Sequence, residues 1–268
     1  MFFLVYLRLI EDSLFKEIYM KEFFDIRYEF DIPAVHEAIG LQLEKGKPGY
    51  ICVADANILT MVHRDNSYRD VINGSIFSIS DSSWVPVFVK WIYGVKYSNY
   101  CGYSIFTDIV KSGKYRMMFL GTNQQTLDAM QNNLKKINPA VADMQFIELP
   151  FCKVDEFDYE AIGEMVNEDA PDIIWVALGA PKQEIFMNRL MPHINRGVAI
   201  AVGAVFNFYS GLENNPKRCP QWMQKCNLEF LHRIFVEPKK QLTRCKNIIR
   251  NLPSILIKET KRKRWTNA

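Results

Sequence analysis

Two aspartates, Asp55 and Asp81, each follow a short apolar segment of the sequence, residues 50–54 and 75–80. Apolar runs of this length predict buried parallel strands. Ligands bind beyond the carboxyl ends of such strands, so a carboxylate there can act as a general base that takes a proton from a hydroxyl group. The alternative is that each aspartate only caps the helix that follows it.

Two further apolar runs end in glycine, at Gly179 and Gly203, and have the residue types of anion-binding turns. The residues after Gly179 predict a helix, which places Lys182 and Gln183 at its N-terminus. Backbone N–H groups and the helix dipole favour an anion at that position. Asn207 follows Gly203 at the same predicted edge of the sheet. The alternative is an ordinary strand-to-helix turn, in which glycine is needed only for the backbone shape.

A third turn, Gly121-Thr122-Asn123, directly follows the strand-like residues 116–120. Its backbone can approach a bound phosphate, as in other turns at this edge of a parallel sheet. Thr122 or Asn123 can equally be a simple cap of the helix that follows. The sequence leaves both interpretations open.

Strands and helices that alternate along the chain must position these residues. The strands are expected within residues 23–32, 50–54, 75–80, 116–120, 145–149, 173–178 and 198–202. The helices are expected at residues 33–45, 58–72 with Gly74 as a C-terminal cap, 84–93, 102–112, 124–136, 159–168 and 181–190. This order predicts an α/β fold, a Rossmann-like parallel sheet flanked by helices. There is no GxGxxG motif, so a dinucleotide-binding version has no support.

The C-terminal segment differs from the rest of the chain in charge. Fourteen Lys and Arg residues and three acidic residues follow Pro216, which gives this segment a formal net charge of +11 and leaves −8 for residues 1–215. Residues 221–236 and 239–258 predict basic amphipathic helices, the last broken or started at Pro253. Four aromatic residues lie among the cations: Trp222, Phe230, Phe235 and Trp265. The pattern is typical of an interfacial helix on an anionic membrane, although a solvated basic face or a nucleic-acid partner is the alternative.

Three segments follow from these patterns: an N-terminal extension of uncertain status (residues 1–22), an α/β catalytic domain (23–213) and a basic helical membrane-docking appendage (214–268). No apolar run reaches the roughly 18 residues of a membrane span. The six cysteines form no CxxC pair and have no histidine at zinc-site spacing. We expect free thiols and no metal site.

Three ordered motifs carry a resemblance to a known family: LGAPKQE at residues 178–184, VGAVFNFYSG at 202–211 and PKRCPQWMQKCNLEFLHRIFVEPKK at 216–240. They resemble the WecG/TagA/CpsF glycosyltransferases (glycosyltransferase family 26). Weaker similarity extends upstream to about Phe24.

The resemblance implies an inverting, metal-independent glycosyltransferase without a cofactor. It would move a hexosyl or N-acetylhexosaminyl group, as an N-acetylmannosaminyltransferase does, from a UDP-sugar to a polyprenyl-diphosphate-linked acceptor sugar. The product would serve a cell-surface polysaccharide: capsule, exopolysaccharide, O-antigen or a teichoic-acid-like polymer. The protein would be cytoplasmic and peripherally associated with the inner face of the bacterial membrane. No nucleic-acid partner is expected, and homo-oligomerisation stays open.

Site residues follow from the matched motifs. The expected catalytic residues are Asp81 as the base, Gln183 of the PKQE motif and Arg233, which the resemblance favours over Arg244. The expected substrate-binding residues are Asp55, Gly121, Thr122, Asn123, Gly179, Lys182, Gly203, Asn207, Arg218 and Arg244. Arginine suits the tail positions because its planar fork can grip two phosphate oxygens.

Several positions depart from the family pattern around the expected sugar pocket. Val53 and Asp55 replace the Thr and Asn of a T-x-N motif, Asn99 replaces an Arg, and Asn207 replaces the Asp of FDF. We therefore expect a different donor sugar or a changed acceptor. Two alternative functions remain at this stage: a catalytically altered membrane-associated scaffold and a nucleic-acid-binding α/β protein.

Overall fold

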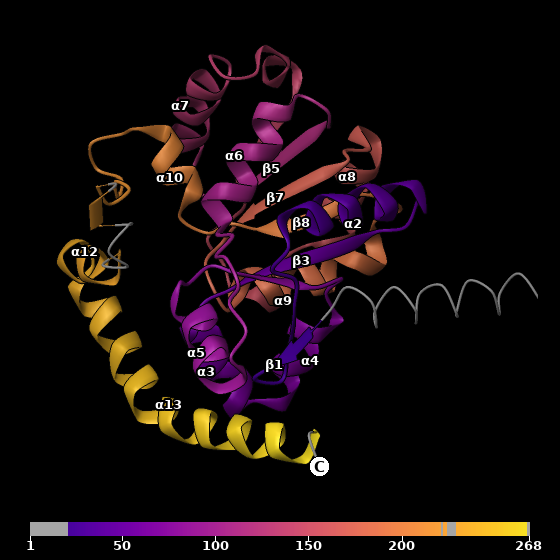
Figure 1. Cartoon of the computed structure of the whole chain (residues 1–268). Coiled ribbons are helices and arrows are strands. Elements are labelled where there is room, and N and C mark those ends of the chain that lie inside the picture. Colours follow the sequence, from indigo (N-terminus) through magenta and orange to yellow (C-terminus); the bar gives the residue numbers. More distant parts are fainter. Residues whose placement is uncertain (1–20, 221, 224–228, 267–268) are drawn as a thin grey trace, which may run out of the picture.

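The computed structural model describes residues 21–220, 222–223 and 229–266. Its centre is an eight-stranded sheet in the order β1-β2-β4-β3-β8-β7-β5-β6 (Figure 1). Only β1 and β2 pair antiparallel, and the remaining pairs are parallel. The strands are β1 Lys21–Phe23, β2 Ile26–Tyr28, β3 Gly49–Ala54, β4 Ser78–Ser80, β5 Met117–Gly121, β6 Gln145–Ile147, β7 Ile173–Ala177 and β8 Val198–Ala201.

Helices cover both faces of this sheet, because alternate residues of each strand point to opposite sides. In β7, Ile174 and Val176 pack into one core cluster, and Ile173 and Trp175 into the other. The first cluster includes side chains of α3 Ala56–Arg64, α4 Asn66–Gly74, α5 Trp84–Tyr93, α8 Tyr159–Asp169 and α9 Lys182–Leu190. The second includes those of α2 Ile32–Glu44, α6 Gly102–Ser112, α7 Gln124–Leu134 and α10 Val205–Ser210. The expected α/β fold with a Rossmann-like sheet is confirmed.

One predicted helix is wrong in detail. Residues 58–72 form parts of two helices, α3 and α4, which Asp65 separates. The Asp65 side chain accepts hydrogen bonds from the backbone N–H groups of Ser67 and Tyr68, so it caps the start of α4. Gly74 is the last residue of α4 instead of a cap beyond its end. A Cβ atom at Gly74 would lie 2.5 Å from the Tyr50 hydroxyl oxygen, so a larger residue here would have to displace the tip of the Tyr50 side chain.

The N-terminal end of the described chain is a short hairpin. β1 begins at Lys21, two residues before the expected start of the α/β domain, and β2 extends the parallel sheet beside β4. Phe24 and Asp25 form the turn with positive φ angles. Residues 1–20, which contain most of the predicted extension, lie outside the described residues.

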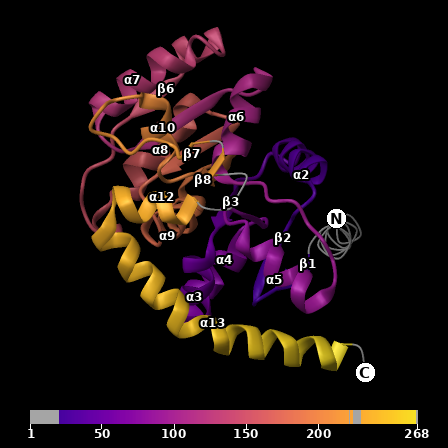
Figure 2. The same cartoon turned by 60° about the vertical axis from the view of Figure 1, so that its left-hand side comes forward.

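The C-terminal part wraps around the α/β domain as two helices, α12 Glu229–Val236 and α13 Pro238–Thr266 (Figure 2). The expected break at Pro253 is wrong, because α13 continues through it. Proline removes one backbone hydrogen bond and strains the preceding turn, which kinks a helix when packing holds both halves. Figure 1 shows α13 bending along its length, and Pro253 lies near the middle of its sequence. The two halves can therefore follow the curved surface of the domain.

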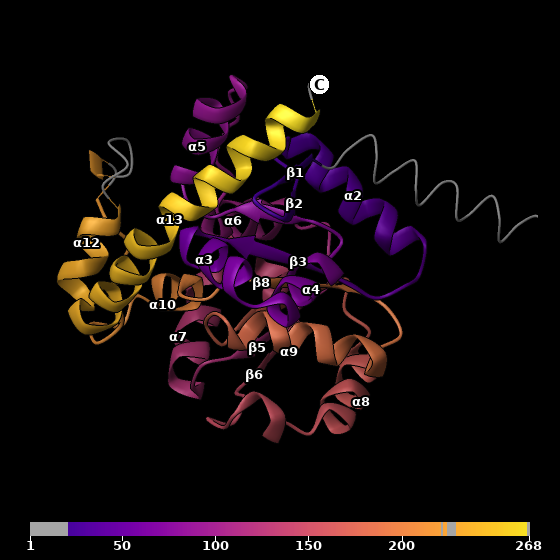
Figure 3. The same ribbon diagram turned by 90° about the horizontal axis from the view of Figure 1, so that it is seen from below.

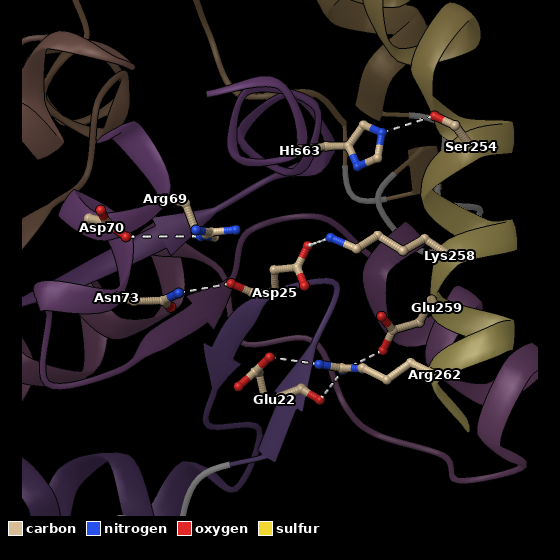
Figure 4. A network of polar contacts seen from close by, with 10 residues as sticks. All are labelled: Glu22, Asp25, His63, Arg69, Asp70, Asn73, Ser254, Lys258, Glu259 and Arg262. Carbon is tan, nitrogen blue, oxygen red and sulfur yellow. Dashed lines mark hydrogen bonds and ion pairs between the residues drawn. The ribbon is translucent and has the colours of Figure 1, made fainter. Parts of the chain in front are cut away.

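The second half of α13 packs against α3 and α5, as seen from below in Figure 3. Ile255 and Glu259 are buried there. Lys258 forms an ion pair of 2.6 Å with Asp25, and Arg262 forms pairs with Glu22 at 2.6 Å and Glu259 at 2.5 Å (Figure 4). These two basic side chains of the tail therefore hold α13 to the β1–β2 hairpin.

Two further expectations concern the chain as a whole. Within the described residues, no helix combines the length and the apolar composition that crossing a membrane requires. Among the described cysteines, those at 52, 152 and 245 have free thiols. Cys226, the sixth, lies outside the described residues.

Candidate functional site

A cavity of about 310 Å³ opens at the carboxyl ends of β3, β4, β7 and β8, and residues from the C-terminal part complete its wall. Parallel strands bring their carboxyl ends to one edge, which is why residues far apart in sequence meet here. Eight of the predicted site residues line this cavity: Asp55, Asp81, Gly179, Gln183, Gly203, Asn207, Arg218 and Arg244. We call it the polar pocket.

Asp81 follows β4 directly and lines the polar pocket. Its Oδ1 accepts a hydrogen bond of 2.9 Å from the backbone N–H of Gly102, the first residue of α6. A carboxylate is stabilised at a helix N-terminus. Ser83, not Asp81, is the N-cap residue of α5, the helix that follows β4. The capping alternative therefore does not describe Asp81, whose anchor comes from a helix 21 residues further along the chain.

Gly102 is a site residue that the sequence did not single out. A Cβ atom there would lie 3.3 Å from Val53 Cγ1 and 3.6 Å from Asp81 Oδ1. Such spacing leaves little room, so glycine lets the start of α6 approach both β3 and Asp81. Its only signal in the sequence is a glycine at the start of a predicted helix.

Asp55 combines the two interpretations that the sequence left open. Its Oδ1 accepts a hydrogen bond of 2.9 Å from the Ile58 N–H, so it is the N-cap of α3. It also lines the polar pocket beside Val53 and Asp81. Capping fixes the Asp55 carboxylate at the pocket wall.

Gln183 is held in one orientation by its neighbours. Its Oε1 accepts a hydrogen bond of 3.0 Å from the Gly179 N–H, and its Nε2 donates one of 2.9 Å to Glu184 Oε1. The Tyr68 hydroxyl donates to the other Glu184 oxygen at 3.2 Å. Glu184 and Tyr68 were not predicted as site residues, although Glu184 is part of the PKQE motif itself.

Glu184 is fully buried, and this burial raises its pKa to about 7. Removal of the carboxylate from water is the largest cause, and hydrogen bonds from Gln183 and Tyr68 oppose it. The negative charge of Asp55 acts in the same direction as burial. The carboxyl group therefore changes its protonation state near neutral pH, directly behind a pocket residue.

We expect this group to make stability depend on pH. The unfolded chain releases the Glu184 proton near pH 4.5 and the folded protein near pH 7, so the free energy of unfolding falls as pH rises through this window. The shift corresponds to about 3 kcal/mol. Glu184→Gln should gain stability relative to the unmodified protein by up to about this amount between pH 5 and pH 8. Urea unfolding at each pH measures the difference, and Glu164→Gln, at an exposed position on α8, is the control.

Arg218 reaches the polar pocket from the segment before α12. Its guanidinium carbon lies 3.5 Å from the centroid of the Tyr103 ring, in cation–π contact. Tyr103 stacks on Tyr209 at 5.3 Å, and the Tyr209 hydroxyl shares a hydrogen bond of 2.7 Å with Thr107. The aromatic stack thus fixes a cation at the pocket wall. The sequence predicted Arg218 but missed the tyrosines, because nothing in their spacing relates them to position 218.

The first half of α13 also contributes to the wall of the polar pocket. Arg244 and Gln241 line it from α13, and His232 lines it from α12. Gln241 and His232 were not predicted. Arg233 lies within α12, but its side chain is outside the described part of the structure. Its catalytic role stays a prediction.

Four predicted residues do not belong to this pocket wall: Gly121, Thr122, Asn123 and Lys182. Asn123 Oδ1 accepts a hydrogen bond of 2.9 Å from the Thr126 N–H, as a cap of α7. Gly121 has a φ of 121°, and a Cβ atom there would lie 2.6 Å from the Ala177 carbonyl oxygen. Lys182 Nζ donates to the Cys152 carbonyl oxygen at 2.5 Å and faces the Phe157 ring. Their roles in substrate binding remain predictions.

The polar pocket thus combines carboxylates and arginines in one wall. Asp55 and Asp81 come from the sheet edge, and Arg218 and Arg244 from the C-terminal part. A carboxylate can accept a proton from a hydroxyl nucleophile, and guanidinium groups can bind a leaving group that carries phosphate. Among the described residues, no three His, Cys, Asp or Glu side chains form a cluster that could hold a metal ion.

Known proteins resemble this chain in sequence. A family model described as "Glycosyl transferase WecG/TagA/CpsF family" matches residues 22–267. An N-acetylglucosaminyldiphosphoundecaprenol N-acetyl-beta-D-mannosaminyltransferase of Bacillus spizizenii is 24% identical over 201 residues, which cover 74% of this chain and 75% of that protein. A protein of the same name from Bacillus subtilis (strain 168) is 27% identical over 177 residues, covering 65% and 66%. With nearly all of its described residues matched by the family model, the chain belongs to the WecG/TagA/CpsF family of glycosyl transferases.

Proposed function

We propose that the protein transfers a sugar from a UDP-sugar to a polyprenyl-diphosphate-linked acceptor sugar, with inversion at the anomeric carbon. The observation that carries this proposal is the polar pocket, whose wall Asp81 shares with Arg218 and Arg244. The activity after which the two Bacillus relatives are named, an N-acetylmannosaminyl transfer to a lipid-diphosphate-linked acceptor, supports both the reaction class and the acceptor class. The polymer that receives the product is a cell-surface polysaccharide.

The reaction is a single displacement. The acceptor hydroxyl oxygen attacks the anomeric carbon while the bond from that carbon to the UDP oxygen breaks. Asp81 accepts the hydroxyl proton, held in place by the Gly102 N–H. Arg218 and Arg244 compensate the charge that develops on the departing UDP. Gln183 lies at the pocket wall, where it can hydrogen-bond to the donor sugar.

A donor screen tests this proposal. Purified protein receives a panel of UDP-sugars, with UDP-N-acetylmannosamine among them, and a synthetic lipid-diphosphate acceptor, and product masses are measured. We expect one sugar to be transferred. The departures at Val53 and Asn207 lie in the pocket wall, so the preferred sugar can differ from that of the relatives. Failure with every donor would favour the catalytically altered scaffold instead.

We predict that chelation leaves turnover largely intact. Arginines rather than a metal ion would stabilise the leaving group in this pocket. Turnover is measured with and without EDTA, on the donor that the screen identifies. A loss of activity that Mg²⁺ or Mn²⁺ restores would show that the arginine account is wrong.

We also propose that the enzyme works at the inner face of the cytoplasmic membrane. Apart from Lys258, which pairs with Asp25, five of the described basic residues of α13 are exposed: Lys239, Lys246, Arg250, Lys261 and Arg264. Phe235, Leu242 and Ile249 add exposed apolar side chains on α12 and α13. A helical surface with both features binds anionic lipid, at about 1 kcal/mol for each cation near the surface.

A further inference from the structure

A second cavity, of about 380 Å³, lies between α5 and the middle of α13. Trp84 and Phe88 line it from α5, and Ile248, Ile249 and Leu252 from α13. We call these five residues and the space between them the apolar groove. Its volume is in the range of ligand sites, and its lining differs from that of the polar pocket in being mainly hydrophobic.

The apolar groove and the polar pocket are continuous. Asp55, Asp81, Gln241 and Arg244 line both cavities. Asp81, the candidate base, and Arg244 therefore both stand at the junction, where the polar pocket meets the hydrophobic lining. In a ligand that occupied both cavities, an anionic group between its two ends would lie beside the Arg244 guanidinium.

The outer rim of the groove is exposed and apolar. The exposed fraction of Ile249 is 73% and that of Trp84 is 42%. Trp91, about two turns after Trp84 in α5, is 74% exposed. Large apolar side chains that gather on a surface mark an interaction site, and tryptophan is favoured where an apolar phase meets water. The groove thus opens where a lipid chain could leave a membrane.

We propose that the apolar groove holds the isoprenoid units next to the diphosphate of the acceptor. This proposal rests on the function proposed above. The acceptor is a sugar, a diphosphate and a hydrocarbon chain in that order, and the structure offers the polar pocket, Arg244 and the apolar groove in the same order. The sugar hydroxyl then reaches Asp81, the diphosphate meets Arg244, and the chain lies between α5 and α13.

The test compares two acceptors with the same sugar and diphosphate, one with a polyprenyl chain and one with a short alkyl chain, both in detergent so that vesicle binding does not contribute. Ile249→Glu places a charge at an exposed position of the groove, where we expect the fold to tolerate it. Ile248→Glu places a charge at a less exposed position of the same groove. We expect the ratio of kcat/KM, polyprenyl over short-chain, to fall about tenfold or more in both variants, because a charge opposes burial of the hydrocarbon.

Ile257→Glu is the matched control, since Ile257 is a 57% exposed residue of the same helix that does not line the groove. It should keep the ratio of the unmodified protein. An unchanged ratio in Ile249→Glu, or an equal fall in Ile257→Glu, would overturn the groove assignment while transfer itself is still observed.

Absence of transfer to either acceptor by the unmodified protein would instead count against the proposed function. In that case, a measurement of ligand binding tests the assignment of the apolar groove separately from transfer. Farnesyl diphosphate should bind more tightly than inorganic diphosphate, and Ile249→Glu, but not Ile257→Glu, should remove that advantage. Equal affinity of the two ligands for the unmodified protein would refute the groove.

Discussion

Replacing Asp81 by Asn should lower sugar transfer by about two to four orders of magnitude, the usual contribution of a general base. The amide keeps the shape of the side chain, and its Oδ1 can still accept the 2.9 Å hydrogen bond from Gly102. It cannot accept the proton of the acceptor hydroxyl. Turnover is measured with the donor and acceptor that the screen identifies, and UDP affinity by titration calorimetry should change little.

The matched control is Asp158→Asn. Asp158 is also an aspartate at a helix N-terminus, where its Oδ1 accepts a hydrogen bond of 3.0 Å from the Ala161 N–H, but it does not line the polar pocket. Its variant should keep full turnover. Near-normal turnover in Asp81→Asn, with the fold confirmed by circular dichroism, would mean that another group accepts the proton.

Replacing Arg244 by Ala should lower turnover by about two orders of magnitude, similar to the loss of one donor from a site that stabilises a developing anion. Arg244 lines both cavities, so its loss affects both the departing UDP and the diphosphate of the acceptor. Arg244→Lys should recover only part of the rate, because an ammonium group keeps the charge but lacks the planar fork.

Arg250→Ala separates chemistry from membrane binding. Arg250 is an exposed residue of the same helix outside both cavities. Each variant removes one positive charge, so both should weaken sedimentation with anionic vesicles by a similar, small amount. Only Arg244→Ala should lose turnover on a soluble short-chain acceptor. Equal turnover in the two variants would contradict the role of Arg244.

The basic tail illustrates why charge alone does not assign function. From the charge pattern alone, all cations of the tail have the same predicted role in membrane binding. In the structure, Lys258 and Arg262 instead form ion pairs with Asp25 and Glu22 of the hairpin (Figure 4). Lys263 donates to the Ile92 carbonyl oxygen at 2.6 Å. Neutralising these residues would loosen α13 from the domain as well as weaken membrane binding, so exposed cations such as Arg250 are the informative positions.

The sequence by itself determined the sheet and the edge at which the site forms. Short apolar runs that alternate with helical segments predict a parallel sheet. In such a sheet the carboxyl ends of the strands lie at one edge, which brings Asp55, Asp81, Gly179 and Gly203 together. Local capping was equally predictable, as at Asn123, because the cap and its partner are only three residues apart.

Tertiary structure alone decided which side chains face the pocket and what holds them. The sequence placed Lys182 beside Gln183, but packing turns Lys182 towards Cys152, while Tyr68, 116 residues from Glu184, completes the network behind Gln183. Arg244 reaches the site because the first half of α13 forms part of the pocket wall. The position of each of these side chains depends on its direction from the backbone and on contacts between elements that are distant in sequence. Packing supplies the free energy of those contacts, and a local sequence pattern does not contain that information.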